Sequence, residues 1–344
     1  MTGNYDSFMY NIKQITADFV VDEVSKLDLV PQGNFLIYEL KKKNCNTIQA
    51  LQEIAKYLRI PLKFLGFAGL KDKHGITTQF ISIKKSYARI LFEVSQFKSE
   101  LIELELVGEL ENPISLGDLL GNRFTVVVRN LESDISVLDL KLVENYFDEQ
   151  RFSTKNPDVG LAILKKDFKL ACEIANEHCI NNALKKNPTD FVGAFKKIPL
   201  KTRLIYIHSV QSLIFNKLLA RIISDNEHSK EVDYSFGKFI FSDEKIENFK
   251  LPLVGFATEY LDSDVKDHAC EILNEMGIKQ TSFAIRSMPE LSVVGDERDA
   301  FIEVKDFSFE FLDDERNNDK KKCVLKFFLN KGAYATMIVK KLFG

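Results

Sequence analysis

The chain is organised around one short polar interruption between two apolar runs. Residues 64–70 are apolar and contain two glycines, residues 76–83 are rich in β-branched side chains, and Lys71-Asp72-Lys73-His74-Gly75 separates them. This pattern predicts two strands joined by a short loop that carries one carboxylate between two ammonium groups. The flanking cations favour the charged carboxylate, so we expect Asp72 to be ionised at neutral pH. Such a group can be a nucleophile, a base or an electrostatic stabiliser, although the same five residues also suit an ordinary solvated hairpin loop.

Length and composition predict an ordinary globular protein of one large or two medium domains, with 344 residues of which 45% are hydrophobic and 28% charged. No apolar run approaches the roughly 18 residues that a membrane helix needs. The first six residues show no basic and then apolar leader, so we expect a cytoplasmic protein without a membrane partner. The five cysteines are scattered without a Cys-x-x-Cys pair, which argues for reduced thiols and against a metal site.

Hydrophobic periodicity predicts strands near both ends of the chain and helices in the middle. The expected strands lie within residues 8–43, as Phe19–Val21 and Asn34–Leu40, and at Leu101–Leu106, Phe124–Val128, Phe307–Phe311 and Cys323–Leu329. The expected helices are Thr47–Leu58, capped by Asn46 or Thr47, then Leu138–Phe147, Asp167–Ile180, Ile205–Ile223, Ser263–Met276 with Gly277 as C-cap, and Tyr334–Phe343. This distribution favours an α+β fold in which one domain interrupts another, rather than regular βαβ repeats.

The net charge of −3 and the pI of about 6.1 argue against a simple nucleic-acid coat protein. They do not exclude an enzyme that acts on RNA, because binding needs a basic face rather than a basic total. Each candidate basic run could equally be a solvated charge cluster. The runs are Lys41–Lys43, then Lys185, Lys186, Lys196, Lys197, Lys201 and Arg203, and finally Lys320–Lys322.

Five ordered motifs connect the polar loop to a known family. The loop motif is Gly69–His74 with Thr77–Gln79 behind it, and the others are Ala17–Glu23, Gly121–Thr125, Asn145–Phe147 with Gln150–Phe152, and Gly332–Thr336. In this order they resemble the TruD family of tRNA pseudouridine synthases. The resemblance runs from near residue 13 to the end of the chain, and five motifs in order are specific where any one alone would be weak.

The resemblance implies a fold, an activity and a partner. It implies an α+β pseudouridine synthase catalytic domain with a mixed or antiparallel sheet, formed by residues 1–147 plus 304–344 and interrupted by a helix-rich TRUD domain at 148–303. The activity would be that of an isomerase that converts uridine 13 in the D arm of tRNA to pseudouridine, without a cofactor or a metal. We expect tRNA as the partner of a monomeric protein.

The resemblance also implies a set of site residues. Asp72 matches the catalytic nucleophile, which would attack either the uracil ring or C1′ of the sugar, and the sequence does not choose between them. Lys13 matches a lysine that approaches this aspartate. The positions that match substrate contacts are Phe19, Asn122, Phe124 and Tyr334.

The residues also allow plainer interpretations of these positions. Phe19 and Phe124 would equally suit a core, and Lys13 an exposed surface. Lys71 and Lys73 could contact phosphates, and we expect His74 to be solvated or hydrogen-bonded rather than catalytic. The Asn122 amide could read uracil as both donor and acceptor.

Three positions depart from the family pattern. Leu120 stands where a lysine commonly precedes Gly-Asn, and Asp148 and Ser153 replace two glycines. If those glycines take positive φ, aspartate tolerates the conformation better than serine does. Two other functions stay open: a non-catalytic tRNA-binding or folding protein on the same scaffold, and a glycosidase. The glycosidase would need a second acidic residue across from Asp72.

Overall fold

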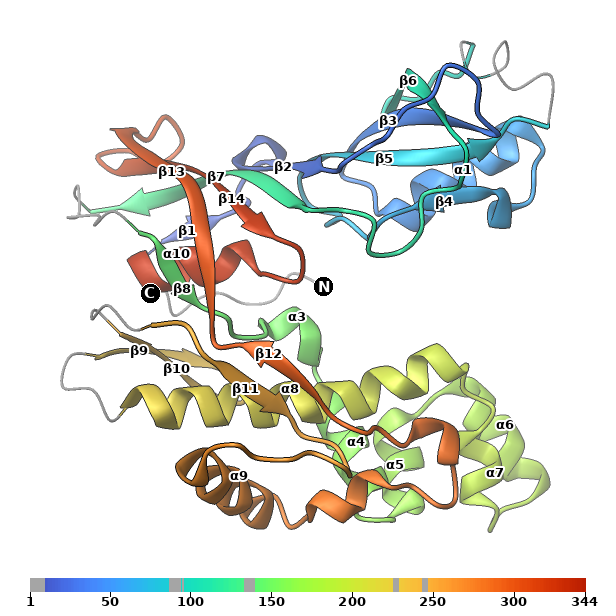
Figure 1. Ribbon diagram of the computed structural model, residues 1–344, viewed down its shortest axis with the longest axis vertical. Helices are drawn as coiled ribbons and strands as arrows, with labels where there is room; N and C mark the ends of the chain where they lie inside the picture. The colour runs from blue at the N-terminus through green and yellow to red at the C-terminus, as the bar shows by residue number, and fades with distance from the viewer. Residues whose placement is uncertain (1–9, 87–93, 95, 133–139, 225–228, 243–246) are drawn as a thin grey trace. The chain divides into compact units, whose positions relative to one another are not determined.

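The computed structural model describes residues 1–344 except 1–9, 87–93, 95, 133–139, 225–228 and 243–246. The chain forms two compact units (Figure 1). Unit 1 contains residues 1–142, 303–335 and 343, and unit 2 contains residues 143–302, 336–342 and 344. The sheet of unit 1 and the helices of unit 2 give a mixed α+β fold with a central helical region, which confirms the α+β part of the prediction.

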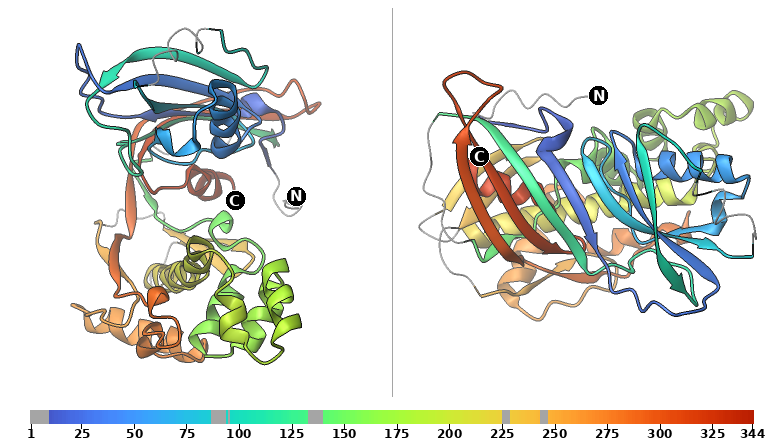
Figure 2. Two further views of the ribbon diagram at one scale, coloured as in Figure 1. Left: turned by 90° about the vertical axis from the view of Figure 1, so that its right-hand side faces the viewer. Right: turned by 90° about the horizontal axis from the view of Figure 1, so that it is seen from above.

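Unit 1 is built on one large mixed sheet whose strands lie side by side in the right-hand view of Figure 2. β2 and β5 run parallel, whereas the other pairs with a described register are antiparallel. The short strands β1 (Asn11–Ile12) and β4 (Leu65–Phe67) pair with β7 and β5. The order in unit 1 is β6 (Ile102–Leu110), β3 (Phe35–Lys43), β5 (Ile76–Lys84), β2 (Phe19–Val24), β7 (Gly121–Leu131), β14 (Lys321–Asn330) and β13 (Phe301–Asp313). The short strand β8 (Leu142–Glu144) lies in the chain at the boundary between the two units.

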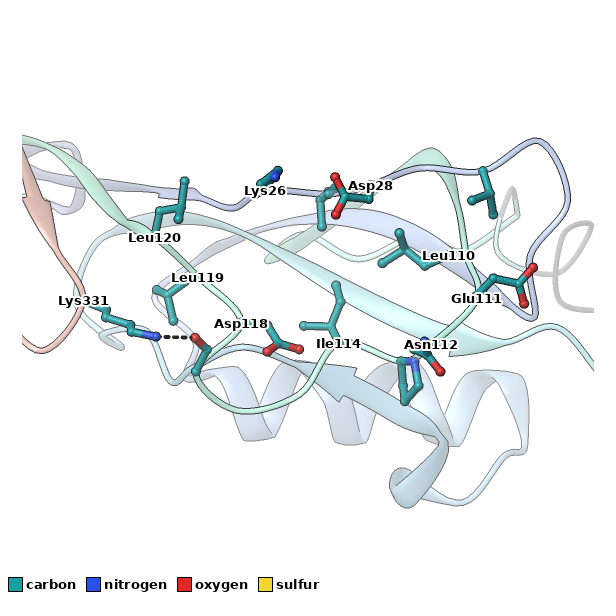
Figure 3. Close-up of a pocket in the computed structure, with 14 residues that line it drawn as sticks. Lys26, Asp28, Leu110, Glu111, Asn112, Ile114, Asp118, Leu119, Leu120 and Lys331 are labelled. Atoms are coloured by element: carbon teal, nitrogen blue, oxygen red, sulfur yellow. Dashed lines mark hydrogen bonds between the residues drawn. The ribbon is translucent and has the colours of Figure 1, made fainter.

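A pocket of about 570 Å³ lies in unit 1, beside the segment that leads into β7 (Figure 3). Its wall combines leucine side chains with charged groups. The lining residues are Lys26, Leu27, Asp28, Val30, Leu110, Glu111, Asn112, Pro113, Ile114, Gly117, Asp118, Leu119, Leu120 and Lys331. Asp72 is not among them, so the pocket is separate from the predicted nucleophile.

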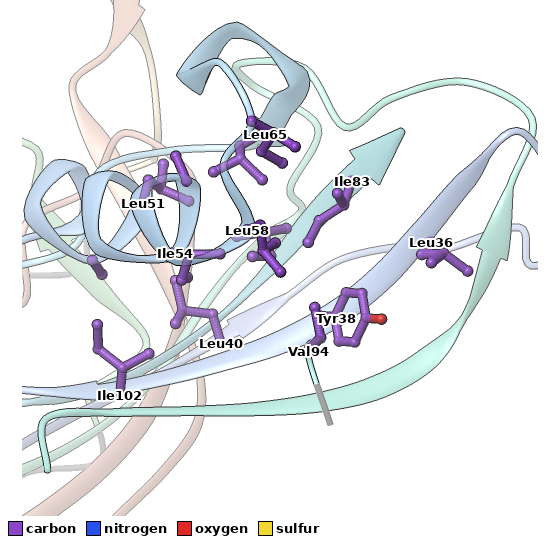
Figure 4. Packing of buried hydrophobic residues seen from close by; sticks show 14 of the residues in the cluster. Leu36, Tyr38, Leu40, Leu51, Ile54, Leu58, Leu65, Ile83, Val94 and Ile102 are labelled. Atoms are coloured by element: carbon purple, nitrogen blue, oxygen red, sulfur yellow. The ribbon is translucent and has the colours of Figure 1, made fainter. Parts of the chain in front are cut away.

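Helix α1 (Thr47–Leu58) packs its apolar stripe onto β3, β5 and β6 (Figure 4). Asn46 caps it by accepting from the backbone N–H of Gln49, and the Gln49 side chain accepts from the Asn46 N–H in return. The stripe includes Leu51 and Ile54, both fully buried, and each such side chain contributes roughly 1.5–3 kcal/mol. The core thereby fixes the start of α1 next to the loop between β4 and β5.

Most sequence-predicted elements are confirmed, with some changes at their ends. Helix Thr47–Leu58 has the predicted bounds, and α9 (Ser263–Glu275) ends before Gly277, which has a φ of 67°. The long helix predicted from Ile205 begins earlier, as α8 (Leu200–Ser224). The last helix is α10 (Ala335–Phe343). The start of the strand region predicted at residue 8 lies outside the described residues.

Unit 2 surrounds the long helix α8, against which α4 (Asn156–Leu164) and α9 pack. Two antiparallel strand pairs complete the unit: β9 (Ser229–Tyr234) with β10 (Gly237–Ser242), and β11 (Lys250–Leu253) with β12 (Asp296–Asp299). The sequence prediction missed these strands and α4. Shorter helices are α3 (Glu149–Phe152), α5 (Phe168–Ala175), α6 (His178–Lys186) and α7 (Phe191–Phe195).

Two predicted helices are wrong. Residues 138 and 139 of the predicted helix Leu138–Phe147 lie outside the described residues, and the remainder forms β8 and an extended segment. There the backbone N–H and carbonyl of Phe147 bond to the Asn216 amide at 2.9 and 2.8 Å instead of to helical neighbours. The predicted helix Asp167–Ile180 is α5 and α6, separated at Asn176, whose φ of 46° ends α5.

Two lysine–carboxylate pairs bind α10 within unit 2. Lys340 Nζ lies 2.7 Å from Asp148 Oδ1, and Lys341 Nζ lies 3.0 Å from Glu144 Oε2. Asp148 also accepts a hydrogen bond of 2.6 Å from Thr336 Oγ1. Burial raises the pKa of Asp148, but the Lys340 ammonium and the Thr336 hydroxyl outweigh it and leave the pKa below its usual value. These bonds explain why residues 336–342 group with unit 2.

Candidate functional site

Asp72 lies in the middle of the loop between β4 and β5. The Asp72 side chain is 33% exposed, and its neighbours Lys73 and His74 are exposed. Gly75 closes the loop with a φ of 156°, and a Cβ there would lie 2.6 Å from the carbonyl oxygen of Phe19. Only glycine allows this close approach, which brings the loop against the start of β2.

Asp72 is paired with the lysine that the sequence nominated. Lys13 Nζ donates to Asp72 Oδ2 at 3.1 Å, and it lies 3.9 Å from the centre of the Phe19 ring. Lys13 has a φ of 58°, a left-handed conformation that is uncommon for lysine and fixes the direction of its side chain. The ammonium group therefore interacts with both a carboxylate and an aromatic face.

Phe19 and Phe124 pack against each other within unit 1. Their ring centres are 6.2 Å apart in an edge-on arrangement, and Phe124 stacks on Phe327 at 5.4 Å. Phe19 is only 3% exposed and Phe124 7%. Phe19 thus adjoins the Lys13–Asp72 pair, and Phe124 lies behind it. Both rings also belong to the core, and stacking of either ring on a base stays a prediction.

Lys71 has partners of its own, and they are not phosphates. Its Nζ lies 2.8 Å from Glu23 Oε2 and donates to Asn122 Oδ1 at 2.6 Å. The Lys71 side chain is 5% exposed and that of Glu23 is 0% exposed, so the predicted phosphate contact by Lys71 is wrong. Because an ammonium group can only donate, Asn122 must turn its oxygen toward Lys71, which leaves its NH₂ group to donate elsewhere. The amide oxygen keeps a second lone pair, so the expectation that Asn122 offers uracil both a donor and an acceptor stays a prediction.

Three buried side chains, for which the sequence predicted no contact with the loop, hold the backbone of the loop. Lys42 Nζ donates to the carbonyls of Cys45 at 2.6 Å, Asp72 at 2.7 Å and Lys71 at 3.5 Å. Thr47 Oγ1 accepts from the Lys71 N–H at 2.9 Å and donates to Gln79 Oε1 at 2.8 Å. Gln79 Nε2 donates in turn to the Gly69 carbonyl at 3.1 Å.

The alternation of apolar and polar side chains along β3 was the sequence signal that could have shown Lys42 to be buried. The alternation places it on the same face as Leu36, Tyr38 and Leu40, which are core residues. The side chain is 1% exposed, so Lys42 is not part of a solvated basic run.

A buried cluster fixes the segment before β2. The Arg129 guanidinium bonds to Asp18 at 2.9 Å, Asp314 at 2.7 Å and Glu315 at 2.9 Å. Asp18 also accepts from the backbone N–H of Ile15 at 2.9 Å. This cluster therefore immobilises the residues between Lys13 and Phe19, and both of these contribute to the site.

Comparison with known proteins decides the family. Residues 4–177 and 170–342 match the family described as tRNA pseudouridine synthase D (TruD). The chain belongs to the TruD family. A Methanococcus maripaludis relative named "Probable tRNA pseudouridine synthase D 1" is 28% identical, over 96% of this chain and 99% of its own length. A Methanocaldococcus jannaschii relative named "Probable tRNA pseudouridine synthase D 2" is 30% identical, over 95% and 90%. The crystal structure of a Methanosarcina mazei protein named "Putative tRNA pseudouridine synthase D (TruD)" superimposes with a TM-score of 0.74 at 26% identity, covering 96% and 93% of the two chains.

The departures from the TruD pattern have separate structural consequences. Ser153 does take a positive φ, of 51°, whereas Asp148 is extended at −78° and uses its carboxylate to bind α10. Leu120 is 55% exposed and shares the pocket of Figure 3 with Lys331, whose Nζ donates to the Gly117 carbonyl at 2.9 Å. The ammonium group of Lys331 thus lies beside Leu120, although residue 120 itself has no charged side chain.

The last predicted TruD contact, Tyr334, is half-buried in the turn between β14 and α10. It comes two residues after Gly332, which has a φ of 85°. Lys13, Phe19 and Asp72 are joined by direct contacts, and Phe124 and Asn122 reach them through Phe19 and Lys71. The position of Tyr334 relative to this network stays a prediction.

The three basic runs of this TruD chain differ in their partners. Lys320, Lys321 and Lys322 each pair with a carboxylate, on Glu132, Asp313 and Glu315 respectively. Lys41 pairs with Glu103 at 3.6 Å. In the run at residues 185–203, Arg203 is buried and paired with Glu290, so it does not contribute to an exposed basic surface. The remaining lysines of that run are exposed, and none takes part in an ion pair among the described residues: Lys185, Lys186, Lys196, Lys197 and Lys201.

The described part of the chain has neither a candidate membrane span nor a candidate metal cluster. No described helix is long and apolar enough to cross a membrane. No group of three or more histidine, cysteine, aspartate or glutamate side chains within the described ranges could hold a metal ion.

Proposed function

We propose that this chain converts a uridine of tRNA, position 13 of the D arm, to pseudouridine with Asp72 as the nucleophile. The supporting observation is the Asp72 carboxylate itself. One of its oxygens is bound by Lys13 at 3.1 Å, while the side chain keeps one third of its surface open. A nucleophile needs this combination of a fixed position and an accessible oxygen.

The isomerisation balances without a redox partner. The bond between N1 of uracil and C1′ breaks, the detached base turns, and a bond between C5 and C1′ forms. C5 then loses a proton, and N1 carries one in the product. Asp72 would attack either the ring or C1′, be displaced again, and return unchanged, so no cofactor is needed.

The residues around Asp72 suit an everted uridine. Turning a base out of its stack costs a few kcal/mol, which contacts in the site must offset. In this proposal the Asn122 NH₂ group donates to a uracil oxygen, because its own oxygen is held by Lys71. Phe19, Phe124 and Tyr334 would supply aromatic contacts.

We also propose that the inserted TRUD domain, expected at 148–303, contacts the tRNA backbone. The exposed lysines of α6, of the segment directly after α7 and of the start of α8 carry this proposal, since none of them forms an ion pair among the described residues. Unpaired lysines gain most from phosphates, because their charge is not already neutralised. We expect a cytoplasmic monomer.

Base-resolution mapping tests the function directly. Purified protein incubated with an unmodified tRNA transcript should form one pseudouridine, at position 13, and Asp72→Asn should form none. Tight tRNA binding without product would favour the alternative, a non-catalytic binding protein. A glycosidase would need a second acidic side chain besides Asp72. The acidic side chain linked to the loop through Lys71 is Glu23, and it is buried and paired with Lys71, which disfavours this alternative.

A further inference from the structure

Lys42 is a buried cation whose three contacts all lie on the loop segments around Asp72. Its ammonium group has three N–H bonds, and three carbonyls accept from it: those of Cys45, Lys71 and Asp72. Two of these three belong to the predicted nucleophile and to the residue before it. No carboxylate neutralises Lys42 among the hydrogen bonds and ion pairs of the described residues, which is unusual for a buried lysine.

We propose that Lys42 is a positioning residue that fixes the backbone of Asp72 for attack, and that its ammonium form is the active one. This inference rests on the proposed function. A charged donor binds carbonyls more strongly than a neutral one. If Lys42 loses its proton, two N–H bonds must serve three carbonyls, and the nitrogen lone pair faces an oxygen. The Asp72 backbone is then held by fewer bonds, although Thr47 still holds the Lys71 N–H.

The surroundings of Lys42 set the pH at which this happens. Burial lowers the pKa of Lys42 to about 8; Cys45 and Asp72 raise it, and Lys71 lowers it further. Its partners across the sheet, Thr77 on β5 and Ile102 on β6, carry no charge, and neither does Thr47 at the start of α1. The active form should therefore be lost within an accessible pH range.

The test compares Lys42→Met with Lys43→Met, since Lys43 is the exposed neighbour of Lys42 on the same strand. We expect Lys42→Met to lower kcat on the order of 100-fold, the effect of a small misplacement of a reacting group. The KM for tRNA should change less than about threefold, because a side chain that is 1% exposed does not reach RNA. Lys43→Met should keep the wild-type kcat. A raised KM with unchanged kcat in Lys42→Met would overturn the proposal.

A conservative variant and a pH profile separate positioning from mere stability. Wild-type kcat should fall above pH 8, and Lys42→Arg, which stays protonated, should move that fall to higher pH. If neither variant folds, the wild-type profile decides alone. A kcat that is flat to pH 10 in folded protein would contradict the proposal.

Hydrogen exchange tests the contact without substrate. The amides of residues 71–75 should exchange faster above pH 8, after correction for intrinsic rates, whereas those of β6 should not. If wild type makes no pseudouridine but this exchange pattern appears, the proposed function fails and the role of Lys42 in holding the loop stands. If wild type is active and the loop exchange has no pH step, the Lys42 inference fails alone.

Discussion

Lys71 and Asp72 are consecutive in the chain, but their side chains belong to different networks. The ammonium group of Lys71 is 2.8 Å from the buried carboxylate of Glu23, whereas Asp72 bonds to Lys13 at 3.1 Å. The Lys71 charge is therefore committed to the interior, and the cation that touches the Asp72 carboxylate comes from a residue 59 positions away. This division leads to different expected effects for substitutions that look similar in the sequence.

Asp72→Asn should abolish turnover while leaving the fold intact. Loss of a nucleophile lowers the rate by about 10³-fold or more, because the remaining site cannot replace it. Stability should change by no more than about 1 kcal/mol, since the pair with Lys13 is partly exposed. Single-turnover pseudouridine formation and thermal unfolding measure the two effects. Asp22→Asn, on the exposed face of β2, is the matched control and should be fully active.

Lys13→Met should lower kcat by about 10²-fold, because it removes the charge that binds one Asp72 oxygen. Lys63→Met is a useful control, since Lys63 also lies over a phenylalanine ring, that of Phe64 at 5.3 Å, but is exposed. The control should behave as wild type in the same single-turnover assay. Equal effects of the two substitutions would contradict a specific role for the pair between Lys13 and Asp72.

Lys71→Met should destabilise unit 1 by about 3–5 kcal/mol, because it removes the only cation paired with the buried Glu23 among the described ion pairs. Lys73→Met, two residues away and exposed, should stay within about 0.5 kcal/mol of wild type. Urea unfolding followed by circular dichroism measures both. The double substitution with Glu23→Gln should recover part of the loss. A Lys71→Met protein of normal stability but weaker tRNA binding would restore the phosphate role rejected above.

Replacing Lys185, Lys186 and Lys201 by alanine should weaken tRNA binding about tenfold or more. It should also reduce the slope of log K against log salt by roughly 2, because about 0.7–0.9 is lost for each phosphate contact. The matched control replaces Lys320, Lys321 and Lys322, whose charges are paired within the protein. Binding curves at several salt concentrations should separate the two triple variants. The surface is misassigned if the control loses as much affinity.

Asp148→Asn should reduce stability at pH 7 by about 3 kcal/mol, as it leaves Lys340 buried without its anion. The pKa of Asp148 is lowered in the folded state, so its contribution is fully present above the unfolded value of about 3.9. That contribution disappears as the pH falls through the lower folded pKa. The difference between wild type and variant should therefore shrink below about pH 4, as urea midpoints across pH would reveal.

Local signals in the sequence were enough for several elements. Helix α1 could be placed because Asn46 and its own apolar stripe define it without reference to the rest of the chain. The break at Asn176 and the extended segment around Phe147 could not be placed in the same way. In the second case the bonds that replace helical ones come from Asn216, 69 residues away.

The site shows the same limit. The loop around Asp72 was recognisable because its residues are consecutive, and Lys13 could be nominated only through the family. Lys42 was grouped with its neighbours as a basic run, since charge is visible in a sequence and burial is not. Its acceptors are 3, 29 and 30 residues away, on loops whose positions depend on the whole sheet.

The final helix limits how this protein can be divided for study. A fragment ending at residue 335, or one spanning only 143–302, would lack Lys340 and Lys341. Glu144 and Asp148, which are 0% and 3% exposed, would then be buried without their lysine partners. Truncation at the carboxyl terminus should therefore damage residues 143–302 of unit 2, although they are more than 30 residues away in sequence. A usable fragment of unit 2 would have to include residues 336–342, joined to residue 302 by an added linker.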